Sequence, residues 1–448
     1  MFSSFSSFSL PRFGFGRDSG SSTAIDIPSV EVHDIETSTD KRDRTLKHLL
    51  KLNHTNYSIL YNRLRFHNHT PHLLGSAYLL GSPPEHLNDI YEDAARNEGH
   101  EPWVDSPSEI ALHDYRDFLG QRNYQRAWVD FFEDQLVLHG YEWKRVVAKF
   151  LFERGPKGSA TEEPMFSCLT AGLAHPLIHL GYAYELNSRE VAMEAMGLAA
   201  TCFDARLAGL LESGTNPTTY STGDLFEVFA HVNSDDRLDG VFEHHGGDNL
   251  SKLLGDAKLT SILVEHWSAW KITDPTKDFA QSQALAAALL VSSAPSVRGH
   301  GWDFFLVHLL TSSHAVRILI PFLEPQYHVR LVKEWLLIAL AIYIAQLRPL
   351  IKTSYITDVD LAGRNWVFVS KQAVEGPYKF DAHFVKACRA LYEADKVWGE
   401  SGPNGEENYW LKAAVKFAGE FAGWGGFGEE DDQMGEELRR DMAERQKA

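Results

Sequence analysis

Histidine is the residue type through which this chain could do chemistry, and its two densest groups lie in apolar sequence. The chain has 21 histidines. One group, in the segment FHNHTPHLL, contains His67, His69 and His72, and the other, in HPLIHLG, contains His175 and His179. Neutral imidazole is the commonest protein ligand of borderline transition metals. Several histidines buried on adjoining faces therefore predict a histidine-rich metal centre within a bundle of helices.

The spacing in HPLIHLG favours a shared role for its two histidines. Four residues separate His175 from His179, so one helix would carry both rings on the same face, as two metal ligands on a helix require. Pro176 complicates this arrangement, because a proline there indicates a helix start or a kink between the two rings.

The segment around His72 has the pattern of a helix start. Thr70 is typical of an N-cap and Pro71 of the first helical residue, which places His72 in the first turn. His69 lies just before that turn and could reach the same side. His67 is expected to serve packing or solvent contact, since a spacing of two residues does not suit one helical face.

Two later segments add candidates. His308 lies among apolar neighbours in DFFLVHLL, and His314 follows six residues later, well round the helix, so both facing one metal is not expected. In DAHFVK, His383 and Lys386 are one turn apart, and Asp381 could orient a ring. Lys386 is either a surface lysine or a buried neutral lysine that adds carbon dioxide and becomes an anionic ligand.

A simpler interpretation stays open for single histidines. A lone buried histidine is more often a hydrogen-bonded core residue than a ligand, and this applies to His308 and His314. The adjacent His244 and His245 are typical of a surface loop.

Composition limits the partners. The chain has 61 acidic and 43 basic residues, a formal net charge of −18, which argues against nucleic acid or an anionic membrane as a partner. The longest apolar run, residues 335–347, is shorter than the roughly 18 residues of a membrane span and predicts a buried helix. The three cysteines, Cys168, Cys202 and Cys388, are too few for a disulfide framework, so the reducing cytosol is the expected location.

The two ends differ from the middle of the chain. Residues 1–40 are rich in Ser, Phe and Gly and predict a disordered arm; an organelle address is less favoured, because no sustained amphipathic pattern is present. Residues 429–448 predict a charged tail. The remainder, residues 41–428, predicts one large all-α, bundle-like domain. Neither its residue spacings nor its composition determine an oligomeric state.

Helical patterns dominate this domain. Apolar periodicity predicts helices over residues 191–211, 284–291, 304–322 and 329–350. Cap residues beside an early proline predict helix starts at residues 82–85, 106–109 and 273–275. Residues 366–370 are the one short candidate for a β-strand. No glycine-rich fingerprint follows a strand and opens a helix, so no nucleotide-binding fold is indicated.

Together the segments FHNHTPH, LLGS, HPLIHLGY, FFLVH and DAHFVK resemble the questin oxidase-like family, a mostly fungal group that includes the Baeyer–Villiger-type oxidase of aflatoxin biosynthesis. The resemblance covers residues 53–389. It implies cleavage of a ring in an anthraquinone or related aromatic polyketide by molecular oxygen. It also implies Fe(II) held by histidines, with a carboxylated lysine among the ligands, and NADPH as a reductant, although no NADPH site is recognisable.

Carried onto this chain, the resemblance implies a set of metal ligands longer than four histidines, so at least one member has another role. The metal candidates are His72, His175, His179, His308, His383 and Lys386. His69 and His314 are held as catalytic candidates.

Two other classes of function remain open. A cofactorless or NADPH-dependent monooxygenase could use the histidines as acid and base. A non-enzymatic helical binding protein would keep them as core residues, which their number in apolar settings disfavours.

Overall fold

The computed structural model describes residues 23–97, 100–214, 217–298, 301–399, 401–402 and 404–428. In these residues the regular structure is almost entirely helical, which confirms the predicted all-α class. The strands form two short pairs: β1 (Leu60–Tyr61) with β2 (Phe66–His67), and β3 (Trp302–Asp303) with β4 (Trp424–Gly425).

The helices follow one another along the described chain. They are α1 (Lys41–Asn56), α2 (Thr70–Leu79), α3 (Pro84–Asn97), α4 (Gln125–Leu138), α5 (Trp143–Phe152), α6 (His175–Leu186), α7 (Arg189–Thr201), α8 (Ala205–Glu212), α9 (Leu225–Asn233), α10 (Asp248–Gly255), α11 (Ala257–Ala269), α12 (Pro275–Val291), α13 (Pro295–Arg298), α14 (Phe304–Leu319), α15 (His328–Ala345), α16 (Ser354–Thr357), α17 (Trp366–Glu375), α18 (Ala382–Trp398) and α19 (Tyr409–Glu420). The longest connections lie before α4 and before α6. Short 3₁₀ turns include η3 (Met165–Cys168) and η5 (Ile320–Phe322).

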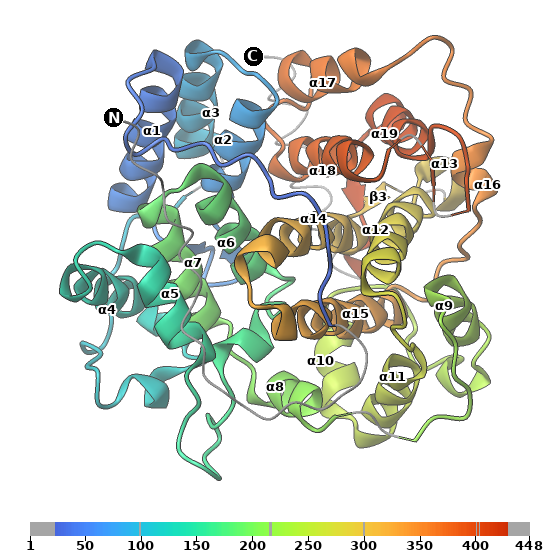
Figure 1. Cartoon of the computed structure of the whole chain (residues 1–448), viewed down its shortest axis with the longest axis horizontal. Helices are drawn as coiled ribbons and strands as arrows, with labels where there is room; N and C mark the ends of the chain where they lie inside the picture. Colours follow the sequence, from blue (N-terminus) through green and yellow to red (C-terminus); the bar gives the residue numbers. More distant parts are fainter. Residues whose placement is uncertain are drawn as a thin grey trace.

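Four helices that carry or begin with histidines pack against one another: α2, α6, α14 and α18. Helix α14 contacts α6, α12, α15 and α18, while α2 contacts both α6 and α18. In Figure 1, α1 to α3 lie together on one side, α17 to α19 lie on another, and α14 runs between α18 and α15. The packing therefore brings together segments that are separated by about 60 to 300 residues of sequence.

Aspartate caps position two of these helices. The carboxylate of Asp303 accepts hydrogen bonds from Phe305 N and Leu306 N at the start of α14. Asp381, which the sequence suggested could orient a ring, is the N-cap of α18 and accepts from His383 N and Phe384 N. A side-chain acceptor at the N-cap satisfies amides that have no partner within the helix.

Several predicted helix boundaries were right and others were wrong. The starts predicted at residues 82–85 and 273–275 correspond to α3 and α12. The single helix predicted over residues 191–211 is two helices, α7 and α8, because Asp204 caps a new helix by accepting from Arg206 N and Leu207 N. The start predicted at residues 106–109 is wrong: that stretch is irregular, and Ser106 Oγ accepts from Ala127 N instead.

Three further boundaries differ. The β-like stretch 366–370 is the first half of α17, because Asn365 caps it through Val367 N and Phe368 N. Helix α15 ends before residue 350, where Leu347 and Arg348 take positive φ values of 59° and 51°. Thr70 is the first residue of α2 and His69 takes the N-cap position, one residue earlier than predicted.

One segment reaches the length and apolar character of a membrane span. It is Phe304–Phe322, covering α14 and η5, and 89% of its most apolar window is buried inside the structure. The run 335–347 falls largely in α15, which is buried along most of its length. Both segments are therefore core helices of the folded chain as described.

The described part of the predicted arm packs against the helices. Ile25, Val30 and Ile35 are buried, and Ile25 N donates to His328 Nδ1. Disorder is therefore a wrong prediction for residues 23–40, whereas residues 1–22 and the predicted tail at 429–448 lie outside the described residues. The division at residues 40 and 428 remains a prediction. The three cysteines are buried and free, as expected for a chain without a disulfide framework.

Candidate metal centre

Four histidines from four parts of the chain converge in the core. One nitrogen from each of His69, His175, His308 and His383 lies within 4.8 Å of the others. We call these residues the four-histidine group. His69 stands at the start of α2, His175 at the start of α6, His308 on α14 and His383 on α18.

Backbone carbonyls determine which nitrogen two of these rings present. His175 Nδ1 lies 2.6 Å from Gly172 O, and His308 Nδ1 lies 2.7 Å from Phe304 O. A carbonyl only accepts, so each Nδ1 carries the proton and each Nε2 of the neutral ring keeps a lone pair. His308 Nε2 and His383 Nε2 are buried and have no hydrogen-bond partner among the described residues.

The turn before α6 holds His175 in a strained backbone. Gly172, Leu173 and Ala174 all have positive φ, at 56°, 56° and 61°. A Cβ at Gly172 would lie 2.8 Å from Cys202 Sγ, so only glycine fits there. Such strain persists where the surroundings enforce it, and here it directs the Gly172 carbonyl at the imidazole of His175.

The four rings are kept uncharged. Burial lowers the pKa of His69, His175 and His383 well below the ordinary value. Burial and the charge of Lys386 lower the pKa of His308 to about 3. Lys386 is itself 2% exposed, and its charge also lowers the pKa of His69 and His383. Neutral imidazoles are the form that binds metals.

His72 and His179 lie outside the four-histidine group and form a second set. His72 Nε2 is 2.9 Å from His179 Nδ1, and His179 Nε2 is 2.8 Å from Glu194 Oε2 on α7. Although His175 and His179 are one turn apart on α6, as the spacing predicts, they therefore serve different sets. Glu194 was missed from the sequence, because an acid in an Ala- and Met-rich helix gives no sign of which histidine it will meet.

Two other histidines have distinct surroundings. His67, expected to serve packing or solvent, is buried and stacks on His175 with ring centroids 3.8 Å apart. His314 is buried near the charges of Arg317 and Arg389, and it does not belong to the four-histidine group. His308 and His314 thus face different surroundings from one helix, as their spacing predicts.

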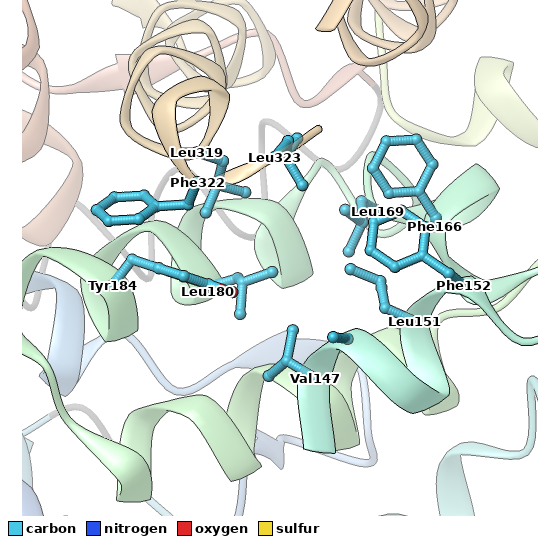
Figure 2. A pocket seen from close by; sticks show the side chains of 11 residues that line it. Val147, Leu151, Phe152, Phe166, Leu169, Leu180, Tyr184, Leu319, Phe322 and Leu323 are labelled. Carbon is cyan, nitrogen blue, oxygen red and sulfur yellow. The ribbon is translucent and has the colours of Figure 1, made fainter. Parts of the chain in front are cut away.

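An apolar pocket lies away from these histidines. Figure 2 shows it between α5, α6, η3 and the end of α14, where Leu180, Tyr184, Leu319 and Phe322 contribute to its wall. Its wall contains no histidine, acid or lysine, so it offers no side chain of the kind that binds a transition metal.

The donor set fits a transition metal. Four neutral imidazoles, two of them with Nε2 atoms that are buried and unpartnered, match the donors preferred by iron, copper, zinc and nickel. The backbone carbonyls behind His175 and His308 supply the outer hydrogen bonds typical of metal-ligating histidines. The fold and the site together define a helical protein built around a buried histidine group able to hold such an ion.

Comparison with known proteins identifies the family. Residues 66–391 match the family described as questin oxidase-like. The chain is 27% identical over 396 residues to the Baeyer-Villiger oxidase AgnL3 of Paecilomyces divaricatus, covering 82% of this chain and 83% of that one. It is 26% identical over 390 residues to a questin oxidase of Aspergillus terreus, covering 82% and 85%. It is also 26% identical over 386 residues to the oxidoreductase AflY of Aspergillus parasiticus, covering 82% and 75%.

The chain belongs to the questin oxidase-like family. Because the relatives are named as oxidases and monooxygenases, it is an oxidoreductase, and the alternative of a non-enzymatic binding protein is set aside. The whole four-histidine group falls within the matched residues.

Proposed function

We propose that this protein uses molecular oxygen to cleave a ring of an anthraquinone or related aromatic polyketide in secondary metabolism, at a non-haem iron held by histidines. The four-histidine group is the observation that carries the proposal, since it offers buried and neutral donors. The names of the relatives, questin oxidase and Baeyer-Villiger oxidase, support the reaction type.

His69, His175, His308 and His383 would hold the metal. Ferrous iron, when bound, supplies the stepwise electron transfer that dioxygen needs to react with a closed-shell organic molecule. Lys386 lies beside these rings, where burying an ammonium group is costly. Addition of carbon dioxide to its amine would give a carbamate that offsets part of the metal's charge. His72 and His179, which the family resemblance places among the metal ligands, are proposed to act beside the metal.

Aromatic side chains border the four-histidine group and suit a flat substrate. The ring centroid of Phe304 lies 4.9 Å from that of His308, 4.6 Å from that of His383 and 5.0 Å from that of Phe427. The ring of Trp424 lies 6.0 Å from His383. Aromatic faces of this kind stack on planar ligands, which supports a polycyclic aromatic substrate.

The electron balance decides whether a reductant is needed. Baeyer–Villiger cleavage places one oxygen atom between a carbonyl carbon and its neighbour, and reducing the second atom to water takes two electrons and two protons. NADPH would supply those electrons, whereas incorporation of both oxygen atoms would need none. The cytosol, where NADPH is available, is the proposed location.

Metal content and oxygen uptake test the proposal together. Protein purified without chelator, or loaded anaerobically with ferrous ion, is expected to hold about one iron per chain by plasma mass spectrometry. That form should consume oxygen with a hydroxyanthraquinone, and ¹⁸O₂ should label the product. Full turnover without stoichiometric metal would contradict the proposal and favour the cofactorless alternative, in which the histidines act as acid and base.

A further inference from the structure

A chain of hydrogen bonds leads from the histidine core to the protein surface. Beyond His72, His179 and Glu194, it continues from Glu194 Oε1 to His54 Nδ1 at 3.0 Å and from His54 Nε2 to Glu133 Oε1 at 2.8 Å. Its inner members are buried, while the side chain of Glu133 is 44% exposed. We call these five residues the relay chain.

Two carboxylates determine the charge in the middle of the relay chain. Both nitrogens of His54 face carboxylates, which only accept hydrogen bonds, so both nitrogens carry protons. Burial alone would lower the pKa of His54, but the bonds and charges of Glu133 and Glu194 raise it to about 10. Burial would likewise raise the pKa of Glu194, yet its bonds to His179 and His54 lower it to about 2. Glu194 is therefore a carboxylate matched by one cation.

The remaining protons follow from that carboxylate. His179 must donate from Nε2 to Glu194. A proton on Nδ1 of His72 would be a buried donor with no acceptor among the described residues, so the proton of that ring belongs on Nε2. His72 then donates from Nε2 to Nδ1 of His179 and keeps a lone pair on its own Nδ1.

The ring that carries this lone pair borders the four-histidine group. His72 Nδ1 is buried and has no hydrogen-bond partner among the described residues. The ring of His72 lies 5.4 Å from His69 and 6.2 Å from His175, and Tyr182 stacks on it at 5.2 Å. Its Nδ1 can thus accept from a group bound beside His69 and His175.

From this geometry we propose that Glu194, held ionised by His54, is a positioning residue that keeps Nδ1 of His72 unprotonated as the acceptor for a substrate hydroxyl group. The role of acceptor rests on the proposed function, because it needs a hydroxylated aromatic in the site. The arrangement of protons does not rest on it.

The proton arrangement can be tested in the metal-free full-length chain. With [¹⁵N]histidine labelling, long-range ¹H–¹⁵N correlation spectra distinguish a protonated from an unprotonated ring nitrogen, and loss of a signal in His72→Gln assigns His72. In the wild type, Nδ1 of His72 is expected to be unprotonated. In Glu194→Gln, the amide can turn its NH₂ to His179, reverse both rings and protonate that nitrogen in part of the population.

Two more variants complete the test. His54→Gln removes the cation, so that Glu194 can recruit a second proton onto His179. The signal of His72 Nδ1 should then shift in the same direction as in Glu194→Gln. This variant keeps the test decisive even if Glu194→Gln fails to fold. Glu133→Gln, at the exposed end, should leave the His72 signal as in the wild type. A wild-type His72 protonated at Nδ1, or one unchanged in both inner variants, would overturn the proposal.

The acceptor role has its own measurement. Binding of 1,8-dihydroxyanthraquinone to the Co²⁺-loaded chain, followed by the dye's absorbance, should weaken about tenfold or more in Glu194→Gln and change less than about threefold in Glu133→Gln. Equal affinity in the wild type and Glu194→Gln would reject this role. A wild-type chain that takes up no Co²⁺ or no dye would count against the proposed function, while the spectra would still decide the proton arrangement.

Discussion

Helices α2 and α6 each contribute one histidine to the four-histidine group and another to the relay chain, and the two sets differ in their hydrogen bonds. His69 and His175 enter the four-histidine group, in which two Nε2 atoms have no hydrogen-bond partner among the described residues. His72 and His179, about one turn further along, enter the relay chain, where a carboxylate follows the histidines. Buried polar groups are normally paired, so the unpartnered Nε2 atoms of His308 and His383 mark the place where a metal ion would complete the four-histidine group.

Two substitutions on α14, one inside and one outside the four-histidine group, should give the largest difference in bound iron and turnover. His308→Ala should lower bound iron from about one per chain to below about a tenth and abolish turnover, because one of four donors is lost. His314→Ala, a buried histidine on the same helix, should keep the metal. Plasma mass spectrometry and oxygen uptake measure both effects. Retained iron in His308→Ala would remove that residue from the ligand set.

Breaking the relay chain should cost stability. Glu194→Ala leaves the His54 cation with a single, partly exposed partner, and the free energy of unfolding should fall by about 3–5 kcal/mol. Glu133→Ala is the matched control, and because Glu133 is exposed its loss should cost no more than about 1 kcal/mol. Urea unfolding followed by circular dichroism measures both values. Equal losses of unfolding free energy in the two variants would show that the buried carboxylate of Glu194 stabilises the fold no more than the exposed one of Glu133.

A second buried carboxyl sharpens the comparison with Glu194. Glu334 on α15 accepts from the amide and the hydroxyl of Thr170, and burial raises its pKa to about 8. Its protonated form is favoured in the folded state, so stability should be highest below about pH 4.5 and decline as the pH rises toward 8.

Glu334→Gln should remove this part of the pH dependence, which amounts to roughly a few kcal/mol between pH 5 and pH 9. Urea midpoints at pH 5, 7 and 9 measure it. A slope that persists unchanged in the variant would assign the decline to other groups.

The smallest expected effect concerns the turn before α6. Ala174 has a φ of 61°, a conformation that glycine adopts without strain. Ala174→Gly should therefore raise stability by about 1 kcal/mol or less without altering the metal content, since glycine also costs backbone entropy on folding. Gly172→Ala, which would bring a Cβ to 2.8 Å from Cys202 Sγ, should do the opposite. A stability loss in Ala174→Gly would show that the turn is not strained.

Local patterns in the sequence predicted much of the fold and part of the site. Asp274 followed by Pro275 marks a helix start that the structure confirms, because capping acts over a few residues. The same reasoning placed a start at residues 106–109, where Ser106 bonds to an amide in α4 instead. No pattern of neighbouring residues distinguishes the helix start that was right from the one that was wrong.

The division of histidines between the two sets was beyond local reasoning. Spacing correctly places His175 and His179 on one face of α6, yet their partners come from other helices, Glu194 on α7 and His308 on α14. His69, held in reserve as a catalytic residue, lies in the four-histidine group, while His72 lies beside it.

By itself, the sequence determined the all-α class, the absence of a disulfide framework and the family, because periodicity, composition and motifs are properties of neighbouring residues. Only the tertiary structure decided which histidines converge and which ring nitrogens keep lone pairs. The physical reason is that a ring's proton follows from the atom facing it, and Gly172 O, Phe304 O and Glu194 meet their histidines only once the helices have packed.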